Sequence, residues 1–137
     1  MRRLSIAILL LLALSVTGCA SDQRSQALLT TLNAYANTMR WGDFSSALQF
    51  VDPKVRKAHP PSSLDMARYK QVRVTEYDEG QGPVPSAENE VHQLVQLGLV
   101  NVNTQVQRTV IDRQTWRYDP VKKHWWLTSG LPDITAD

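Results

Sequence analysis

Three hydrophobic patterns follow one another along the chain. Residues 6–14 form an unbroken apolar run, residues 27–52 carry apolar stripes at helical spacing, and apolar and polar residues alternate in much of the chain after residue 68. Stripes at intervals of three and four predict helices with one buried face, whereas alternation predicts strands of a half-buried sheet. The patterns therefore predict a leader segment, then helices, then a sheet.

The first helical stripe starts at Ala27. Its apolar positions recur at intervals of four, three and four, and two neighbours widen it: Leu28, Leu32, Tyr35 and Met39, with Leu29 and Ala36. Gly42 follows the stripe, at the place where a helix C-terminus accepts a residue with positive φ. The pattern predicts a long helix that ends near Gly42.

A second, shorter stripe follows at once. Asp43 is suited to cap its N-terminus. Apolar residues at the intervals of a helix come next: Phe44, Ala47, Leu48 and Val51. Asp52-Pro53 ends this short helix, because the residue before a proline disfavours helical backbone. Residues 54–59 predict one more helical turn, and residues 59–63, with two successive prolines, predict a loop.

The rest of the chain predicts strands and turns. The expected strands cover residues 68–77, 90–102, 105–118 and 124–129, with a loop at 80–86, turns at 101–104 and 119–123, and an irregular tail from residue 130. In the second strand the residues of one face alternate with those of the other: Val91, Val95, Leu97 and Leu99 against His92, Leu94, Gly98 and Val100. Gly98 predicts a bulge or a bend there.

Helices that precede an antiparallel meander predict an α+β fold. We expect the long N-terminal helix and the short helix to pack on a curved antiparallel sheet of about four strands. The whole arrangement is predicted to form a single globular domain over residues 27–137, because the chain of 137 residues suits one core.

The first eighteen residues have the features of an export signal. Arg2 and Arg3 give a positive start, and the apolar run that follows covers roughly 14 Å as a helix, about half of a bilayer core. A run of that length is typical of a signal peptide rather than of a membrane span. We therefore predict that residues 1–18 are a signal peptide.

Val16-Thr17-Gly18-Cys19 resembles the lipobox of bacterial lipoproteins, which consists of an aliphatic residue, two small residues and a cysteine. The resemblance implies cleavage before Cys19, a lipid on its sulfur, and a polar lipidated tether over residues 19–26. Ala20 stands where an aspartate would favour the inner membrane of enteric bacteria, so the family rule indicates the periplasmic face of the outer membrane. The alternatives are a secreted protein with a free cysteine and an uncleaved anchor.

Charge and cysteine content exclude some functions. The chain carries 15 basic and 13 acidic residues, and loss of Arg2 and Arg3 leaves 13 of each, so the mature chain has a formal net charge of zero. That balance leaves no basic face of the kind that binds nucleic acid. The single cysteine cannot form an internal disulfide.

Two segments resemble nuclear-transport-factor-2-like (ketosteroid-isomerase-like, cystatin-like) α+β domains. The first runs from Tyr35 through Gly42-Asp43-Phe44 to Ala47-Leu48, and the second from Tyr118-Asp119-Pro120 to Trp125-Trp126. The resemblance implies a helix packed on a curved sheet that can enclose a cavity. We find no counterpart of the aspartate and tyrosine used by the enzymatic members, and this fold hosts enzymes, binders and interaction modules alike.

Some side chains are suited to line such a cavity: Tyr35, Tyr69, Tyr77, His92, Asp112, Trp116 and Trp125. They form either a cleft for an apolar ligand or the core of a small domain. His92 is either a base assisted by Asp112 or an exposed strand residue. The three histidines do not have metal-ligand spacing, so we predict no metal and no cofactor.

Trp126 is the candidate for a partner face. Adjacent tryptophans in a strand point to opposite sides of the sheet, so Trp125 and Trp126 cannot both face the core. An exposed Trp126 near Lys122 and Lys123 would meet a protein, the membrane interface or peptidoglycan, unless the C-terminal tail covers it.

Together the patterns predict a lipid-anchored periplasmic lipoprotein whose domain binds a protein partner or a small apolar ligand without catalysis. One alternative is a small enzyme of the isomerase or hydrolase kind that uses cavity residues. Another is an envelope structural or immunity-type protein.

Overall fold

The computed structural model describes the backbone of residues 2–135 and the side chains of residues 18–135. The side chains of residues 1–17 lie outside the described part. The signal-peptide prediction for residues 1–18 therefore concerns side chains of which all but the last lie outside it. The helices are α1 (Arg2–Trp41), α2 (Phe44–Ala47), the 3₁₀ turn η1 (Leu48–Phe50), α3 (Pro53–Ala58) and α4 (Ser63–Tyr69). The strands are β1 (Val72–Asp78), β2 (Val84–Ala87), β3 (Glu90–Asn101), β4 (Gln107–Asp119) and β5 (His124–Leu127).

The long helix α1 ends where the sequence predicts but begins earlier. It is continuous through residues 19–26, so the segment predicted as a tether is helical. Gly42 does not have the positive φ that we expected. A side chain is excluded there for another reason, because a Cβ atom on Gly42 would lie 2.7 Å from the carbonyl oxygen of Thr38.

The predicted cap of the second helix is confirmed. The carboxylate of Asp43 accepts a hydrogen bond of 2.6 Å from the backbone N–H of Ser46. Pro53 then occupies the first turn of α3, where its missing N–H costs nothing. The predicted helical turn near residues 54–59 is therefore confirmed as α3.

Two elements differ from the prediction. The strand expected from residue 68 begins only at Val72, because residues 63–69 form α4. A capping box starts this helix: the Ser62 hydroxyl accepts from the Asp65 N–H, and the Asp65 carboxylate accepts from the Ser62 N–H. Part of the loop predicted at 80–86 is the short edge strand β2, which tolerates Pro85 because proline is accommodated at sheet edges.

All strand pairs are antiparallel, in the order β1-β3-β4-β5. β1 pairs with residues 96–101 of β3 and β2 with residues 90–92, so both flank the same edge of β3. The irregularity predicted at Gly98 is confirmed, although the register shift lies in β1, between Val74 and Glu76. A Cβ atom on Gly98 would lie 2.8 Å from the Cβ of Glu76, so the close approach requires glycine.

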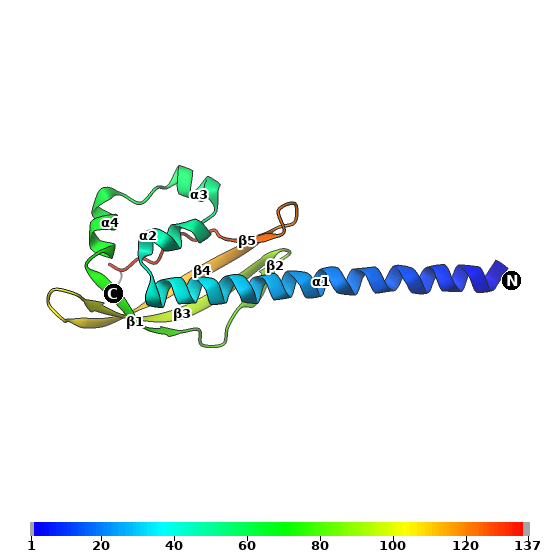
Figure 1. Ribbon diagram of the computed structural model, residues 1–137, viewed down its shortest axis with the longest axis horizontal. Coiled ribbons are helices and arrows are strands. Elements are labelled where there is room, and N and C mark those ends of the chain that lie inside the picture. The colour runs from blue at the N-terminus through cyan, green and yellow to red at the C-terminus, as the bar shows by residue number, and fades with distance from the viewer. Residues whose placement is uncertain (1, 136–137) are drawn as a thin grey trace.

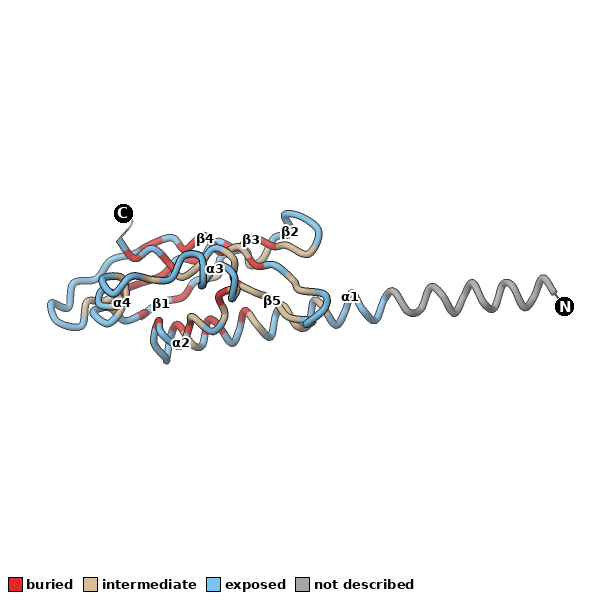
Figure 2. The backbone as a smooth tube through the Cα atoms, turned by 90° about the horizontal axis from the view of Figure 1, so that it is seen from above, coloured by how far each residue is buried: buried red, intermediate tan, exposed pale blue. Residues whose placement is uncertain are grey.

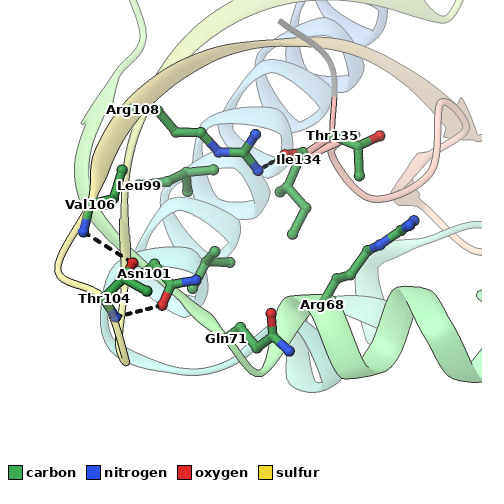
Figure 3. A pocket seen from close by; sticks show the side chains of 10 residues that line it. Arg68, Gln71, Leu99, Asn101, Thr104, Val106, Arg108, Ile134 and Thr135 are labelled. Atoms are coloured by element: carbon green, nitrogen blue, oxygen red, sulfur yellow. Dashed lines mark hydrogen bonds between the residues drawn. The ribbon is translucent and has the colours of Figure 1, made fainter.

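The helices α1 and α2 cover the concave face of the sheet (Figure 1), and the sheet arches over α1 (Figure 3). Buried residues lie along the strands and on the part of α1 that runs beneath them (Figure 2). The predicted alternation of β3 is confirmed, and its buried face carries Val91, Val95, Leu97 and Leu99. The α+β fold with a long helix on a curved antiparallel sheet is thus confirmed. In the part of the chain that the structure describes, no helix combines the length and apolar character needed to cross a bilayer.

Candidate functional site

Most of the side chains predicted to line a cavity meet on the concave face. Tyr35 of α1 packs edge-on against Trp116 of β4, with ring centroids 5.3 Å apart. Tyr69 of α4 stacks on Phe44 at 4.4 Å, and its hydroxyl donates to the carbonyl of Pro132. These contacts join three helices, α1, α2 and α4, and the C-terminal tail to one core.

A chain of hydrogen bonds joins the polar groups of this core. Gln114 lies at its centre, because its amide nitrogen donates to the Asp112 carboxyl at 2.7 Å and to the Tyr77 hydroxyl at 3.1 Å. Its amide oxygen accepts from the Trp116 indole at 3.0 Å. Asp112, Gln114 and Trp116 alternate along β4, so all three point inward from one strand.

Burial dominates the electrostatics of this cluster. Only 6% of the Asp112 surface is exposed. Loss of hydration raises the pKa of Asp112 to about 6, although the hydrogen bond from Gln114 acts in the opposite direction. Burial also raises the pKa of Tyr35, and the nearby Asp112 adds to that shift.

The cluster is closed to solvent. Tyr35 and Trp116 are completely buried, and Tyr77 and Trp125 are nearly so. Within the described residues, the Tyr35 hydroxyl and the amide oxygen of Gln93 are buried without a hydrogen-bond partner. The structure therefore places these four aromatic residues in the core rather than on the wall of an open cleft, whereas Tyr69 is only partly buried.

His92 does not join them: of its two interpretations, the structure shows the exposed strand residue and not a base assisted by Asp112. Strand alternation puts His92 on the convex face, where 58% of its side chain is exposed. It lies 3.3 Å from Glu90, whose carboxylate also accepts a hydrogen bond of 2.9 Å from Arg117. The Arg117 and Ser86 hydrogen bonds lower the pKa of Glu90. A base on one face of the sheet cannot share a proton with a carboxyl on the other.

An open hollow lies at the end of the concave face, beside the β3–β4 turn (Figure 3). Its volume is about 440 Å³, which falls in the range of small-ligand sites, roughly 300–1,000 Å³. Apolar side chains lie in it: Val72, Leu99, Val106 and Ile134. Polar side chains complete the lining: Arg68, Gln71, Asn101, Thr104, Arg108 and Thr135.

Two guanidinium groups dominate the polarity of this hollow. Arg68 comes from α4 and forms a partly exposed ion pair of 3.8 Å with Asp65, one turn away. Arg108 comes from β4 and donates to the carbonyl oxygen of Ile134. The hollow can therefore offer charge-assisted donors to an anion above an apolar floor.

Neither arginine was identified from the sequence as a site residue. Arg108 carried a usable signal, because it shares the inward alternation of Val110, Asp112, Gln114 and Trp116 along β4. A charged residue on an inward position at a strand end indicates the mouth of a concave face. Arg68 carried no such signal, since its segment was expected to be a strand.

The opposite end of the domain lies beside Cys19, which is exposed on α1. Arg24 joins α1 to this end of the domain through two hydrogen bonds. Its guanidinium donates to Asn89 in the β2–β3 turn at 2.7 Å, and its carbonyl accepts from the Trp125 indole at 3.1 Å. Trp126 points to the other side of β5, where its ring lies 4.2 Å from that of His124.

Comparison with known proteins finds no family model, no curated protein and no solved structure that matches this chain. The resemblance to nuclear-transport-factor-2-like domains and the lipobox interpretation therefore stay predictions. Function has to be inferred from the geometry of the domain itself.

Proposed function

We propose that this protein is a lipid-anchored module of the bacterial envelope that binds an amphipathic anion without catalysing a reaction. Lipid on Cys19 would hold the domain at a membrane, as the lipobox resemblance implies. The ligand would be a small molecule with an apolar body and a carboxylate or phosphate group. The binding site would be the hollow between α4, the β3–β4 turn and the C-terminal tail.

The observation that carries the proposal is the pair of arginines above an apolar floor. Arg68 and Arg108 come from different elements and both line the hollow (Figure 3). Leu99 and Ile134 in the same lining are buried side chains of the core, so an apolar ligand body would meet well-packed surface. Each charge-assisted hydrogen bond to the anion would contribute about 1.5–3 kcal/mol.

Two observations support binding rather than chemistry. The residues considered as an acid–base pair, His92 and Asp112, lie on opposite faces of the sheet. The titratable Asp112 and Tyr77 of the core are buried, and both accept hydrogen bonds from Gln114, so a substrate would have to open the core to reach them.

The test uses the mature protein purified from membranes, with decanoate as the probe and calorimetry as the readout. We expect decanoate to bind, and decanol, which lacks the charge, to bind more weakly. Arg108→Gln should weaken decanoate binding by about tenfold or more, because it removes a charged donor.

Arg113→Gln is the matched control, because Arg113 lies on the same strand but is exposed on the convex face. It should leave decanoate binding unchanged. Equal losses in the two variants, or no binding by the unaltered protein, would contradict the proposal. The intact mass of the same preparation reports whether Cys19 carries lipid.

A further inference from the structure

We propose that the end of the domain beside Cys19 is a membrane-contacting surface that fits a bilayer with anionic headgroups. We call it the basal surface, and its members are Arg24, Lys54, Val121, Lys122, Lys123 and Trp126. The proposal rests on the proposed lipid anchor at Cys19. It deepens that function, because it states which end of the domain faces the membrane and which residues touch it.

The helix brings this end close to the lipid. Cys19 precedes Arg24 by five residues, which is about 7.5 Å along a helix axis. The headgroup region on each side of a bilayer is about 5–8 Å thick, as the difference between the total and hydrocarbon thicknesses shows. Because α1 is continuous between the two residues, no flexible tether separates the domain from the anchor. The contacts of Arg24 then lie at the level of the headgroups.

Those contacts define the orientation of the domain. Arg24 is bonded to Asn89 and to the Trp125 indole, and its guanidinium lies 6.0 Å from the centre of the Tyr118 ring. Asn89 belongs to the β2–β3 turn, and Tyr118 and Trp125 flank the β4–β5 turn. Both turns therefore lie where α1 leaves the domain, whereas the β3–β4 turn lies at the far end (Figure 1). The hollow with Arg68 and Arg108 faces away from the membrane.

The β4–β5 turn has the chemistry of a membrane contact. Val121 at its tip is 90% exposed, and Lys122 and Lys123 follow it directly. The Lys122 ammonium lies 5.9 Å from the centre of the half-buried Trp126 ring. An exposed aliphatic side chain beside lysines and a tryptophan suits the interface, where lysines reach phosphates and the indole lies at headgroup level.

The acidic residues nearest to this turn are engaged within the protein. The Asp119 carboxylate accepts from the backbone N–H groups of Val121 and Lys122, and Lys54 of α3 lies close enough to stabilise its charge. Glu90 is paired with Arg117. Glu88 and Asp22 are exposed, and their negative charges would repel anionic lipid. We therefore expect the apolar contact of Val121 to contribute as much to membrane binding as the lysines do.

The test exploits the single cysteine of the chain. When Cys19 carries lipid, a cysteine introduced elsewhere is the one free thiol, and an environment-sensitive fluorophore can be attached to it. Val121→Cys places the label on the basal surface, and Asn103→Cys places it on the exposed β3–β4 turn at the far end. The lipidated proteins are reconstituted in phosphatidylethanolamine–phosphatidylglycerol vesicles that contain nitroxide-labelled phosphatidylcholine.

We expect the label at residue 121 to shift to the blue and to lose most of its fluorescence to the nitroxide, while the label at residue 103 does neither. Lys122→Glu with Lys123→Glu should reduce the quenching at residue 121, whereas Lys70→Glu, at the far end, should not. Lipidated protein with equal quenching at residues 121 and 103 would overturn the basal surface and leave the anchor intact. Protein whose mass shows no lipid on Cys19 would overturn the anchor and, with it, this orientation.

Discussion

Two carboxylates on adjacent strands, Glu90 and Asp112, show how differently the two faces of the sheet treat the same chemical group. Glu90 lies on the convex face, where bonds to Arg117 and Ser86 lower its pKa. Asp112 lies on the concave face, where burial raises its pKa to about 6. The convex face stabilises the ionised form, whereas the concave face favours the protonated acid. A titratable residue in this domain therefore cannot be interpreted before its face is known.

The same contrast separates Trp116 and Trp125 on the concave face from Trp126 on the convex face, and it holds for the two faces as a whole. The concave face is a closed core with a hydrogen-bonded polar interior, whereas the convex face is open to solvent. Any binding by this domain is then expected at the ends and edges of the sheet, where side chains of the core reach the surface.

The largest expected effect comes from removing a concave-face tryptophan. Trp116→Ala should lower the free energy of unfolding by about 3–5 kcal/mol, because it leaves a large cavity against Tyr35 and removes the bond to Gln114. Denaturant titration of the two proteins measures the difference. Trp126→Ala on the convex face is the control and should cost clearly less. Equal costs would contradict the assignment of the two faces.

The next effect is a pH dependence that comes from Asp112. Its folded-state pKa lies above the ordinary value of 3.8, so the folded state binds the proton more tightly than the unfolded chain. Stability from this group is fully present below about pH 4 and is lost as the pH rises through about 6. Two pKa units correspond to about 3 kcal/mol, so Asp112→Asn should be more stable than the unaltered protein by up to that amount at pH 8.

Thermal unfolding between pH 4 and pH 8 measures this dependence. Glu90→Gln is the matched control on the convex face, and its sign is opposite: the lowered pKa of Glu90 stabilises the fold above that pKa and the effect is lost as the pH falls through it. An Asp112→Asn variant that keeps the full loss of stability between pH 4 and pH 8 would contradict the assignment.

The smallest expected effect sharpens the description of the core. The Tyr35 hydroxyl is buried without a partner among the described residues, so Tyr35→Phe should raise the free energy of unfolding by about 1 kcal/mol. The Tyr77 hydroxyl accepts from Gln114, so Tyr77→Phe should instead lower it by about 0.5–1.5 kcal/mol. Denaturant midpoints of the two variants are compared. A loss in Tyr35→Phe as large as that in Tyr77→Phe would show that the Tyr35 hydroxyl has a stabilising contact.

Local signals predicted most of the fold. The stripe of α1, the Asp43 cap, the alternation of β3 and the irregularity at Gly98 all follow from residue spacing, because each depends on neighbours within a few positions. The helix α4 was missed because the prediction did not use the Ser62–Asp65 capping box and assigned the end of the helix to a strand with β-favouring residues such as Tyr69. The edge strand β2 was missed because Pro85 favours a loop prediction unless the pairing of its segment with β3 is known.

The candidate site was only partly predictable, because local patterns do not show which distant segments come together. Alternation along β4 indicates that Asp112 and Trp116 share a face, but not that the space between them and α1 is filled. The hollow combines Arg68, Arg108 and Ile134 from three segments that are far apart in the chain. No local pattern couples those segments, so the sequence did not identify the hollow.

The sequence by itself indicated that helices precede an antiparallel sheet, that two faces alternate along β3, and that a lipid is expected on Cys19, because periodicity and short motifs are local properties. Only the tertiary structure decided that the aromatic residues close the core and that His92 and Asp112 are separated by the sheet. It also decided that α1 holds the end with Val121 beside Cys19. These outcomes depend on how distant segments pack, and packing is set by shape and burial that no single segment contains.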